Sequence, residues 1–225
     1  MAALCRNERG PSLIPVALQP EPADFAVRVR RPGQAFLRFN PRPTSEDFKK
    51  SKANYWAACL PQLRALYGEV CAYSSLWIPM QGTVDHFRPK SIYPHLAYEW
   101  RNYRLALDRI NHSKGESVDV LDPFAIQGGW FALDPATLFV RPEATQTDQV
   151  KVRVQRTIDI LKLNDDAYVK VRFEIFRSYL DSEVSLAFVA RRYPFVAAEI
   201  RRQGIKTAAE KQAGAVGNHD NVRSD

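Results

Sequence analysis

The distribution of proline most strongly limits where this chain can form regular secondary structure. Residues 1–43 hold seven of its 15 prolines, and each proline fixes φ and removes a backbone donor. Five arginines lie in the same segment, between positions 28 and 42. We therefore expect residues 1–43 to form an extended, proline-rich basic arm that either wraps over the domain or contacts phosphate. Within this arm, "DFAVRVRR" alternates apolar and basic side chains, which predicts a short strand with one basic face.

The composition predicts a globular protein with a substantial core. Its 225 residues are 45% hydrophobic and 11% aromatic, which is enough for one domain with extensions. The formal net charge of +7 suits a polyanionic partner, although a modest basic excess also occurs in proteins that never bind nucleic acid. No apolar run approaches the roughly 18 residues of a membrane span, and the first residues lack a signal-peptide pattern. We expect a cytoplasmic protein with no membrane partner.

The segment 44–68 has the pattern of two short helices. Thr44 is a hydroxyl cap followed by acidic residues, and apolar side chains then recur at near-helical spacing up to Gly68. Pro61 cannot continue a straight helix, so we expect a break near Cys59 and a second helix that restarts there.

Residues 126–210 predict a hairpin followed by helices. "GGWFALDPATLFVRPE" places Asp134 and Pro135 at a turn between two short strands. "TDQVKVRVQRTIDILKLN" begins with a Thr-Asp cap signal and predicts an amphipathic helix. Its apolar face consists of Val150, Val154, Ile158 and Leu161.

Two more helices and a tail complete the expected extension. The apolar spacing predicts one helix from Asp165 to about Arg192 and another from Pro194 to about Gln203. Residues 211–225 are polar and contain glycine, so we expect a disordered tail.

Several common nucleotide-binding and hydrolase motifs are absent from the sequence. It contains no GxxxxGK[ST], GxGxxG or GxSxG pattern, which leaves phosphate-loop, dinucleotide and serine-hydrolase sites without support. A site that uses histidine must draw on one of four, and His219 lies in the expected tail. The remaining candidates are His86, His95 and His112.

The segment "TVDHFRPKSIYPHLAYEW", residues 83–100, places Asp85 beside His86. Adjacent side chains point to opposite faces of a strand, but Pro89 predicts that the strand ends within a few residues, which lets both converge. Asn102 follows, and Asn111 and Lys114 share a face if residues 108–114 form a helix. Such residues can bind a hard cation through oxygen, orient an imidazole and neutralise phosphate. A lone Asp-His pair is more often structural, so the order and spacing carry the argument.

The longer stretch "VDHFRPKSIYPHLAYEWRNYRLALDRINHSKG" resembles the core of HNH endonucleases, the ββα-metal nucleases. It is most similar to a branch with D/E-H-F-x-P-K, Y-P-x-L-A-Y-E-W-x-N-Y-R-L and N-x-x-K-G patterns. That branch includes nucleases of Septu-type anti-phage systems, in which an HNH protein works beside an ATPase. The resemblance is dense over residues 70–115 and looser in "DVLDPF" and "TIDILKLN". It implies an α+β fold, with an HNH-like ββα-metal core and leading helices over residues 44–125.

The resemblance also implies roles for individual residues. His86 resembles the general base that takes a proton from the attacking water. Asp85 and Asn111 resemble the oxygen ligands of one Mg²⁺ or Mn²⁺, and Asn102 resembles the residue that holds the histidine ring. Cations expected to contact phosphate are Arg88, Lys90 and Lys114. His95 and His112 match no catalytic position and are expected at the surface or behind the site. The aromatic residues expected to pack rather than stack on bases are Tyr93, Tyr98, Trp100 and Tyr103.

The chain departs from the family pattern at the structural zinc. Many relatives carry a CxxC pair before the Asp-His strand and a second beside the last Asn. Here the first pair reads "CAYS", Cys71 to Ser74, and the second positions are Leu107 and Ile110. With three of four ligands absent, we expect no structural zinc and an apolar contact in its place. The cysteines Cys5, Cys59 and Cys71 are too few and too widely spaced for a disulfide framework and are expected as thiols.

Two functions of different classes follow from the sequence. The first is a metal-dependent HNH endonuclease that hydrolyses DNA, working in anti-phage defence with a partner ATPase. RNA cleavage by the same site stays open, because the metal chemistry does not distinguish the sugar. The alternative is a catalytically inactive HNH-like module that binds nucleic acid or a partner protein.

Overall fold

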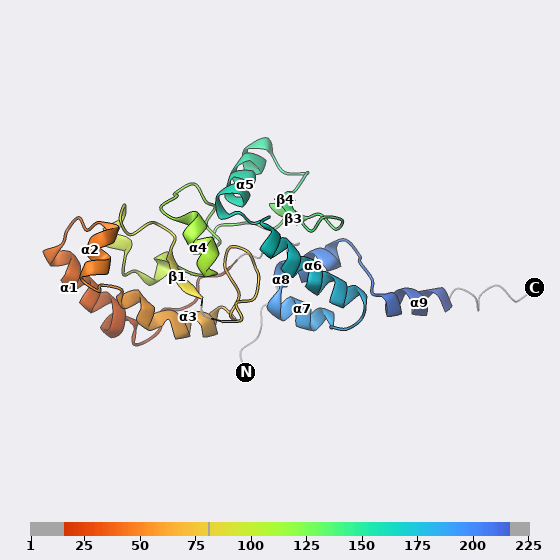
Figure 1. Ribbon diagram of the computed structural model, residues 1–225, viewed down its shortest axis with the longest axis horizontal. Coiled ribbons are helices and arrows are strands. Elements are labelled where there is room, and N and C mark those ends of the chain that lie inside the picture. Colours follow the sequence, from red (N-terminus) through yellow and green to blue (C-terminus); the bar gives the residue numbers. More distant parts are fainter. Residues whose placement is uncertain (1–15, 81, 217–225) are drawn as a thin grey trace, which may run out of the picture.

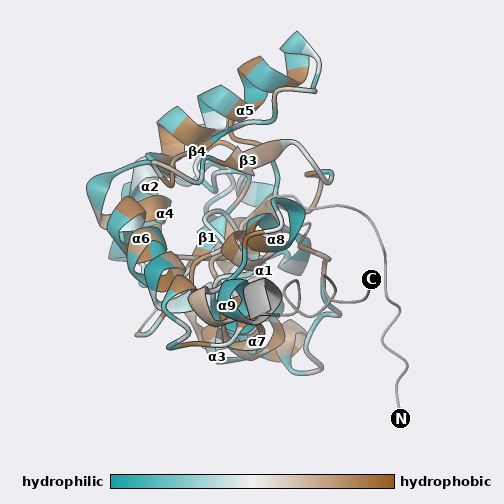
Figure 2. Cartoon of the chain, turned by 90° about the vertical axis from the view of Figure 1, so that its right-hand side faces the viewer, coloured by the Kyte–Doolittle hydropathy of each residue, from teal (hydrophilic) through white to brown (hydrophobic). Residues whose placement is uncertain are grey.

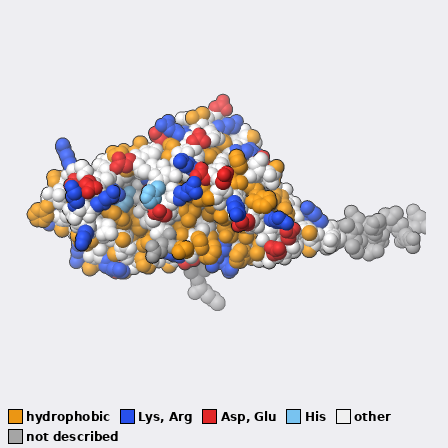
Figure 3. All heavy atoms as spheres, in the orientation of Figure 1, with side chains coloured by type: hydrophobic (Ala, Val, Ile, Leu, Met, Phe, Trp, Pro, Cys, Tyr) orange, Lys and Arg blue, Asp and Glu red, His pale blue; other side chains and the backbone are white. Residues whose placement is uncertain are grey.

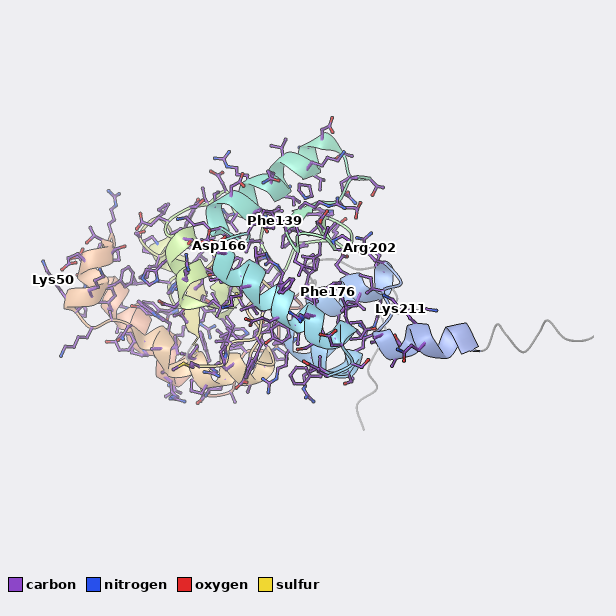
Figure 4. The ribbon with its side chains drawn as sticks, turned by 45° about the vertical axis from the view of Figure 1, so that its right-hand side comes forward. Lys50, Phe139, Asp166, Phe176, Arg202 and Lys211 are labelled. Atoms are coloured by element: carbon purple, nitrogen blue, oxygen red, sulfur yellow. The ribbon has the colours of Figure 1, made fainter. Side chains whose placement is uncertain are left out.

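The computed structural model describes residues 16–80 and 82–216. The fold is α+β, with helices arranged around two small antiparallel sheets within the described residues. Figure 1 shows α1 to α4 and β1 at one end of the molecule and α6 to α9 at the other. Lys50 at the end of α2 and Lys211 on α9 lie near these opposite ends (Figure 4). None of the described helices is long and apolar enough to cross a membrane.

The first sheet and the helix after it form a strand-strand-helix unit. Strand β1 (Thr83–His86) pairs antiparallel with β2 (Tyr103–Ala106), and α4 (Asp108–Lys114) begins two residues after β2. In this register Asp85 lies opposite Arg104, and His86 lies opposite Tyr103. Gly115 ends α4 with a φ of 50°, a conformation that favours glycine. The unit therefore brings the end of β1 beside α4.

The helices before β1 follow the predicted cap and restart. Thr44 and Asp47 form a reciprocal capping box at the start of α2 (Ser45–Lys50). The chain leaves this helix earlier than expected because Lys52 adopts a left-handed φ of 48°. A 3-10 helix, η2 (Tyr55–Cys59), leads into α3 (Leu60–Leu66), whose first turn contains Pro61. The predicted restart near Cys59 is confirmed.

The strand predicted from "DFAVRVRR" is wrong. This segment is helical, with a π-helix η1 (Ala26–Arg30) that continues into α1 (Arg31–Phe39). Phe25 and Val29 are four residues apart, so one helical face buries both, at 1% and 0% exposure. The helix α1 also packs closely on the core, because a Cβ at Gly33 would overlap the Tyr98 ring. Residues 25–39 are thus packed structure rather than an extended arm, and residues 1–15 lie outside the described residues.

The second sheet and the C-terminal helices largely follow the prediction. The expected hairpin is confirmed as β3 (Phe131–Leu133) and β4 (Val140–Pro142), with the Asp134 side chain accepting hydrogen bonds within the turn. Helix α5 (Asp148–Leu161) is confirmed with the Thr147 cap. Hydrophobic and hydrophilic residues alternate along it in Figure 2.

The helices after α5 differ from the prediction in two places. The single helix expected from Asp165 to Arg192 is two helices, α6 (Asp166–Leu180) and α7 (Leu186–Arg192), because Ser182 has a φ of 63° and Ser185 caps α7. Helix α8 (Pro194–Arg202) is confirmed. Helix α9 (Ala208–Val216) contradicts the tail expected from residue 211, and residues 217–225 lie outside the described residues. The remaining short 3-10 helices are η3 (Pro94–Leu96) and η4 (Trp100–Asn102).

One hydrophobic core extends from Phe25 to Ile200 and includes residues of both sheets and of most of the helices. Polar links add to it: Arg104 on β2 makes a bidentate pair with Asp122, and the Arg192 guanidinium lies 4.1 Å from the centre of the Trp77 ring. The division at residue 125 stays a prediction.

Candidate active site

A cavity of about 940 Å³ opens between α2, β1 and α4. Asp85, His86, Lys90 and Asn111 all line it, together with Trp56 from η2. The two adjacent residues on β1 reach one cavity because the strand ends at His86, as the following Pro89 predicted. Figure 3 shows histidine side chains among Lys and Arg on this end of the molecule.

His86 is held in one tautomer by the backbone. Its Nε2 lies 2.8 Å from the carbonyl oxygen of Ala97. A carbonyl only accepts, so Nε2 carries the proton and Nδ1 keeps its lone pair. Nδ1 makes no hydrogen bond to the part of the chain that the structure describes. The rings of Trp56 and Tyr103 hold the imidazole edge-on, with centroids 4.7 and 5.2 Å away.

The surroundings keep His86 uncharged. Burial, the largest cause, acts together with the positive charges of Lys90 and Lys114 to lower the pKa of His86 to about 3, against the raising effect of the Ala97 hydrogen bond. The imidazole is therefore neutral at pH 7, with the lone pair that a general base needs. Such a low pKa also makes it a weak base.

Asn102 does not hold the histidine ring, which corrects the expectation from the sequence. Its Nδ2 donates to the carbonyl oxygens of Arg88 at 3.0 Å and Leu96 at 3.1 Å, and its Oδ1 accepts from the Arg88 N–H at 2.8 Å. The amide thus ties together both ends of the loop between β1 and η4. Because Leu96 precedes Ala97, Asn102 positions the carbonyl that holds the ring.

Asp85 belongs to a buried network with Tyr73 and Lys114. The Tyr73 hydroxyl donates to Oδ2, and the Lys114 Nζ lies 3.0 Å from Oδ1. The Lys114 side chain is 0% exposed and also donates to the His86 carbonyl oxygen at 2.8 Å. Lys114 therefore balances the Asp85 charge in the interior, and this arrangement contradicts the expectation that it contacts phosphate.

Asn111 reaches β1 from α4. Its Nδ2 donates to the Thr83 Oγ1 at 3.0 Å, and Thr83 lies two residues before Asp85 on the same strand face. The Asn111 Oδ1 accepts no hydrogen bond from the described residues. Asp85 on β1 and Asn111 on α4 thus line the same cavity, and they carry a carboxylate and an amide oxygen.

The Asp85 and Asn111 oxygens are of the type that binds a hard divalent cation, but the nearby Lys114 charge opposes cation binding. A carboxylate has about four lone-pair sites, and neither Tyr73 nor Lys114 is among the described residues that line the cavity. Tyr73 and Lys114 each use one of these sites, which leaves lone pairs on a carboxylate whose side chain is 2% exposed. Mg²⁺ is commonly held by one or two carboxylates, with water and phosphate completing its shell. The Lys114 charge weakens the attraction, and no group of three or more His, Cys, Asp or Glu side chains among the described residues could hold a metal.

Three lysines form the lysine rim of the cavity: Lys49, Lys52 and Lys90. None forms an ion pair with a described residue. The Lys90 Nζ lies 5.3 Å from the centre of the Trp56 ring and 5.7 Å from that of Phe48. Partial burial lowers the pKa of Lys90. A partly buried ammonium without an acceptor is suited to bind an anion.

The other predicted cation and the remaining histidines lie elsewhere. The Arg88 guanidinium packs 5.2 Å from the centre of the Phe87 ring and 5.7 Å from that of Tyr93, and Arg88 does not line the cavity. His95 and His112 are both exposed, and His112 stands at the cavity edge beside Asp108. The predicted aromatic packing is confirmed for Tyr98, Trp100 and Tyr103, which are buried.

Two of the residues at the zinc positions are in contact, and the other two are buried. The Cys71 Sγ accepts from the Leu107 N–H at 3.4 Å, and Ile110 is fully buried in the core. The Ser74 Oγ is buried without a hydrogen-bond partner among the described residues. Cys71 and Cys59 are free thiols, and burial raises the pKa of Cys59 to about 12.

Sequence reasoning missed three contributors to the site. Trp56 belongs to the near-helical apolar pattern of residues 44–68 and was interpreted as core, and Tyr73 lies in "CAYS" with no pattern that marks a site. Ala97 acts through its carbonyl, which every residue type carries, so no side-chain signal could reveal it.

Comparison with known proteins assigns no family to the chain. No family model matches it, and no curated protein sequence matches it.

Proposed function

We propose that this protein is a metal-dependent HNH-type endonuclease that hydrolyses DNA phosphodiester bonds at the cavity beside His86. The observation that carries the proposal is the state of His86. The imidazole is neutral, its proton is on Nε2, and its Nδ1 lone pair is free at a cavity rimmed by lysines. The Nδ1 atom is not among the buried, unpartnered side-chain atoms of the described residues, so it is accessible from the cavity that His86 lines.

His86 would act as the general base. Its Nδ1 takes a proton from a water molecule as the water oxygen attacks phosphorus. The bond from phosphorus to the leaving ester oxygen breaks, and that oxygen leaves with a proton from solvent. Phosphate bound near Lys90 would offset one of the charges that depress the pKa of His86, so substrate would strengthen the base.

Asp85 and Asn111 are the residues that would hold the divalent cation. A bound Mg²⁺ or Mn²⁺ supplies charge stabilisation at the phosphate and its leaving oxygen. Tyr73 and Lys114 orient the Asp85 carboxylate from behind, and Thr83 orients the Asn111 amide.

The lysine rim and the net charge of +7 support a nucleic-acid substrate. The choice of DNA, a role in anti-phage defence, an ATPase partner and a cytoplasmic setting rest on the resemblance to HNH nucleases alone. RNA is the competing substrate.

The alternative function is an inactive HNH-like module that binds nucleic acid or a partner protein. Two observations favour it: the Lys114 ammonium neutralises Asp85 within the protein, and a pKa of about 3 makes His86 a weak base. Both would suit a site that keeps the fold without turnover.

Plasmid cleavage distinguishes these functions. Supercoiled DNA is incubated with the protein and Mg²⁺ or Mn²⁺, beside His86→Ala, His86→Gln and the control His112→Ala, which alters an exposed histidine at the cavity edge. We expect nicking by the parent and by His112→Ala, and a loss of about 100-fold or more in both His86 variants. Thermal melts check that the variants fold. Binding without nicking by the parent in either metal would establish the inactive module, and cleavage of RNA alone would change the substrate.

A further inference from the structure

Glu116 is the feature of this site that the proposed function leaves unexplained. It follows Gly115 at the end of α4, and it lies between the active-site cavity and a second cavity of about 670 Å³. Ser45 and Ser91 are the other residues that line both cavities. Glu116, Ser45 and Ser91 therefore form the boundary that the two cavities share.

Its carboxylate joins three separate parts of the chain. Glu116 Oε1 accepts from the Ser45 Oγ at 3.1 Å and from the Ser91 Oγ at 2.5 Å. Ser45 begins α2, and Ser91 lies in the loop after β1. These two hydroxyls and the nearby Lys90 lower the pKa of Glu116, so the group is ionised at neutral pH.

The negative charge of Glu116 suits the basic residues around it but opposes the binding of a nucleic acid at this site. Among the described residues that line the active-site cavity, the only other acid is Asp85, which Lys114 balances. The remaining charged groups there are the lysine rim, and Arg42 lines the second cavity. An anion in this position repels a nucleic-acid backbone. Two hydroxyl donors beside an ammonium are also the groups that bind a phosphate oxygen.

We propose that Glu116 is an internal substitute for a substrate phosphate, and that a nucleic-acid strand must displace it from Ser45 and Ser91 to pass between the two cavities. The contact is autoinhibitory, and the inference rests on the proposed function. Displacement is sterically simple, since Glu116 is exposed and follows a glycine with a φ of 50°.

Binding of a short fluorescein-labelled oligonucleotide, single-stranded or duplex, tests the proposal. Measurements are made in EDTA, where no cleavage occurs, by fluorescence anisotropy. Glu116→Gln is compared with Glu46→Gln, which removes the same charge from α2 at a residue outside both cavities. We expect about tenfold tighter binding for Glu116→Gln and at most about twofold for Glu46→Gln. The salt dependence should steepen by about 0.7–0.9 in log K against log salt, as for one added phosphate contact.

Ser91→Ala distinguishes displacement of Glu116 from simple charge repulsion, because repulsion alone predicts the same effect on affinity in both backgrounds. In the parent, this change loosens Glu116 and should leave binding equal or tighter. In the Glu116→Gln background, the same change removes a phosphate donor and should weaken binding about threefold or more. The reversal of sign is the signature of a shared donor.

The outcomes separate this inference from the proposed function. If the parent nicks plasmid DNA but Glu116→Gln binds no tighter than Glu46→Gln, the inference is overturned and the nuclease stands. Equal effects of Ser91→Ala in both backgrounds would also overturn it. If neither the parent nor Glu116→Gln binds the oligonucleotide, both ideas fail.

Discussion

Charged side chains in the buried network behind the His86 cavity are paired, whereas those of the lysine rim have no ion-pair partner among the described residues. In the buried network, Asp85 has two donors and Lys114 has two acceptors within the protein. In the lysine rim, Lys90 has two aromatic rings beside it but no carboxylate or carbonyl acceptor among the described residues. Charged groups that are paired within the protein stabilise the fold, whereas a charged group without a partner beside a cavity can still bind a ligand. Lysine thus balances a buried carboxylate at position 114, whereas at position 90 it has no acceptor among the described residues.

The largest expected effect comes from breaking the buried network. Lys114→Met should lower the free energy of unfolding by about 3–5 kcal/mol, because it leaves the Asp85 charge buried and unpaired. Urea denaturation measures the change. The double variant Asp85→Asn with Lys114→Met removes both charges and should recover most of the loss. A single-variant cost below about 1 kcal/mol would mean that water reaches Asp85 and the network is not closed.

The free energy of unfolding should depend on pH because His86 has a lowered pKa in the folded protein. The pKa of His86 is about 3 when folded and near 6.5 when unfolded, so the unfolded chain binds more protons between these values. Stability from this group is complete above pH 6.5 and is lost as pH falls toward 3. We expect a loss of about 2 kcal/mol between pH 6.5 and about pH 4.5.

His86→Gln is the matched variant for this measurement, and its stability should fall less over the same range. The carboxylates with lowered pKa values act mainly below this window, since their ordinary values are 3.8 and 4.5. Parallel pH profiles for parent and variant would contradict a buried neutral imidazole.

Lys90→Met is the same substitution as Lys114→Met, but we expect it to change oligonucleotide affinity rather than the free energy of unfolding. Methionine keeps the contacts with Phe48 and Trp56 and removes a desolvated charge, so stability should change by less than about 0.5 kcal/mol. Oligonucleotide affinity should fall about tenfold, as a charged hydrogen bond to phosphate is lost. Unchanged affinity would remove Lys90 from the binding surface.

The smallest effect is expected at the exposed end of the rim. Lys52→Met should weaken oligonucleotide binding about twofold in moderate salt and have no effect in high salt, since exposed charges are screened. Anisotropy titrations at two salt concentrations measure this. An effect as large as that of Lys90→Met would show that the strand passes directly over the turn that follows α2.

Local chemistry made the order of elements around the site predictable. The capping box at Thr44, the restart before Pro61, the hairpin at Asp134 and the amphipathic face of α5 all depend on neighbours within a few residues. The segment at Phe25 was misread because apolar residues there satisfy both a period of two and a spacing of four. Tertiary packing on Tyr98 and Trp100 decides in favour of the helix.

The sequence predicted which residues lie at the candidate site better than it predicted what each residue does there. Asp85, His86, Lys90 and Asn111 do line one cavity. Lys114 and Asn102 were misassigned because burial and backbone partners depend on the fold, which residue spacing does not reveal. Glu116 carried no signal, since its partners lie 71 and 25 residues away along the chain.

The contact between His86 and Ala97 has a consequence for how the site tolerates mutation. Each side chain in the site can be lost by a single substitution, but the acceptor for His86 is a main-chain carbonyl that any residue at position 97 would retain. Tyr103 donates to the same oxygen at 2.8 Å and remains if the histidine is replaced. Substitution at position 97 should therefore leave the imidazole proton on Nε2. A variant that regained a histidine at position 86 would find the same acceptor for Nε2 and therefore the same tautomer.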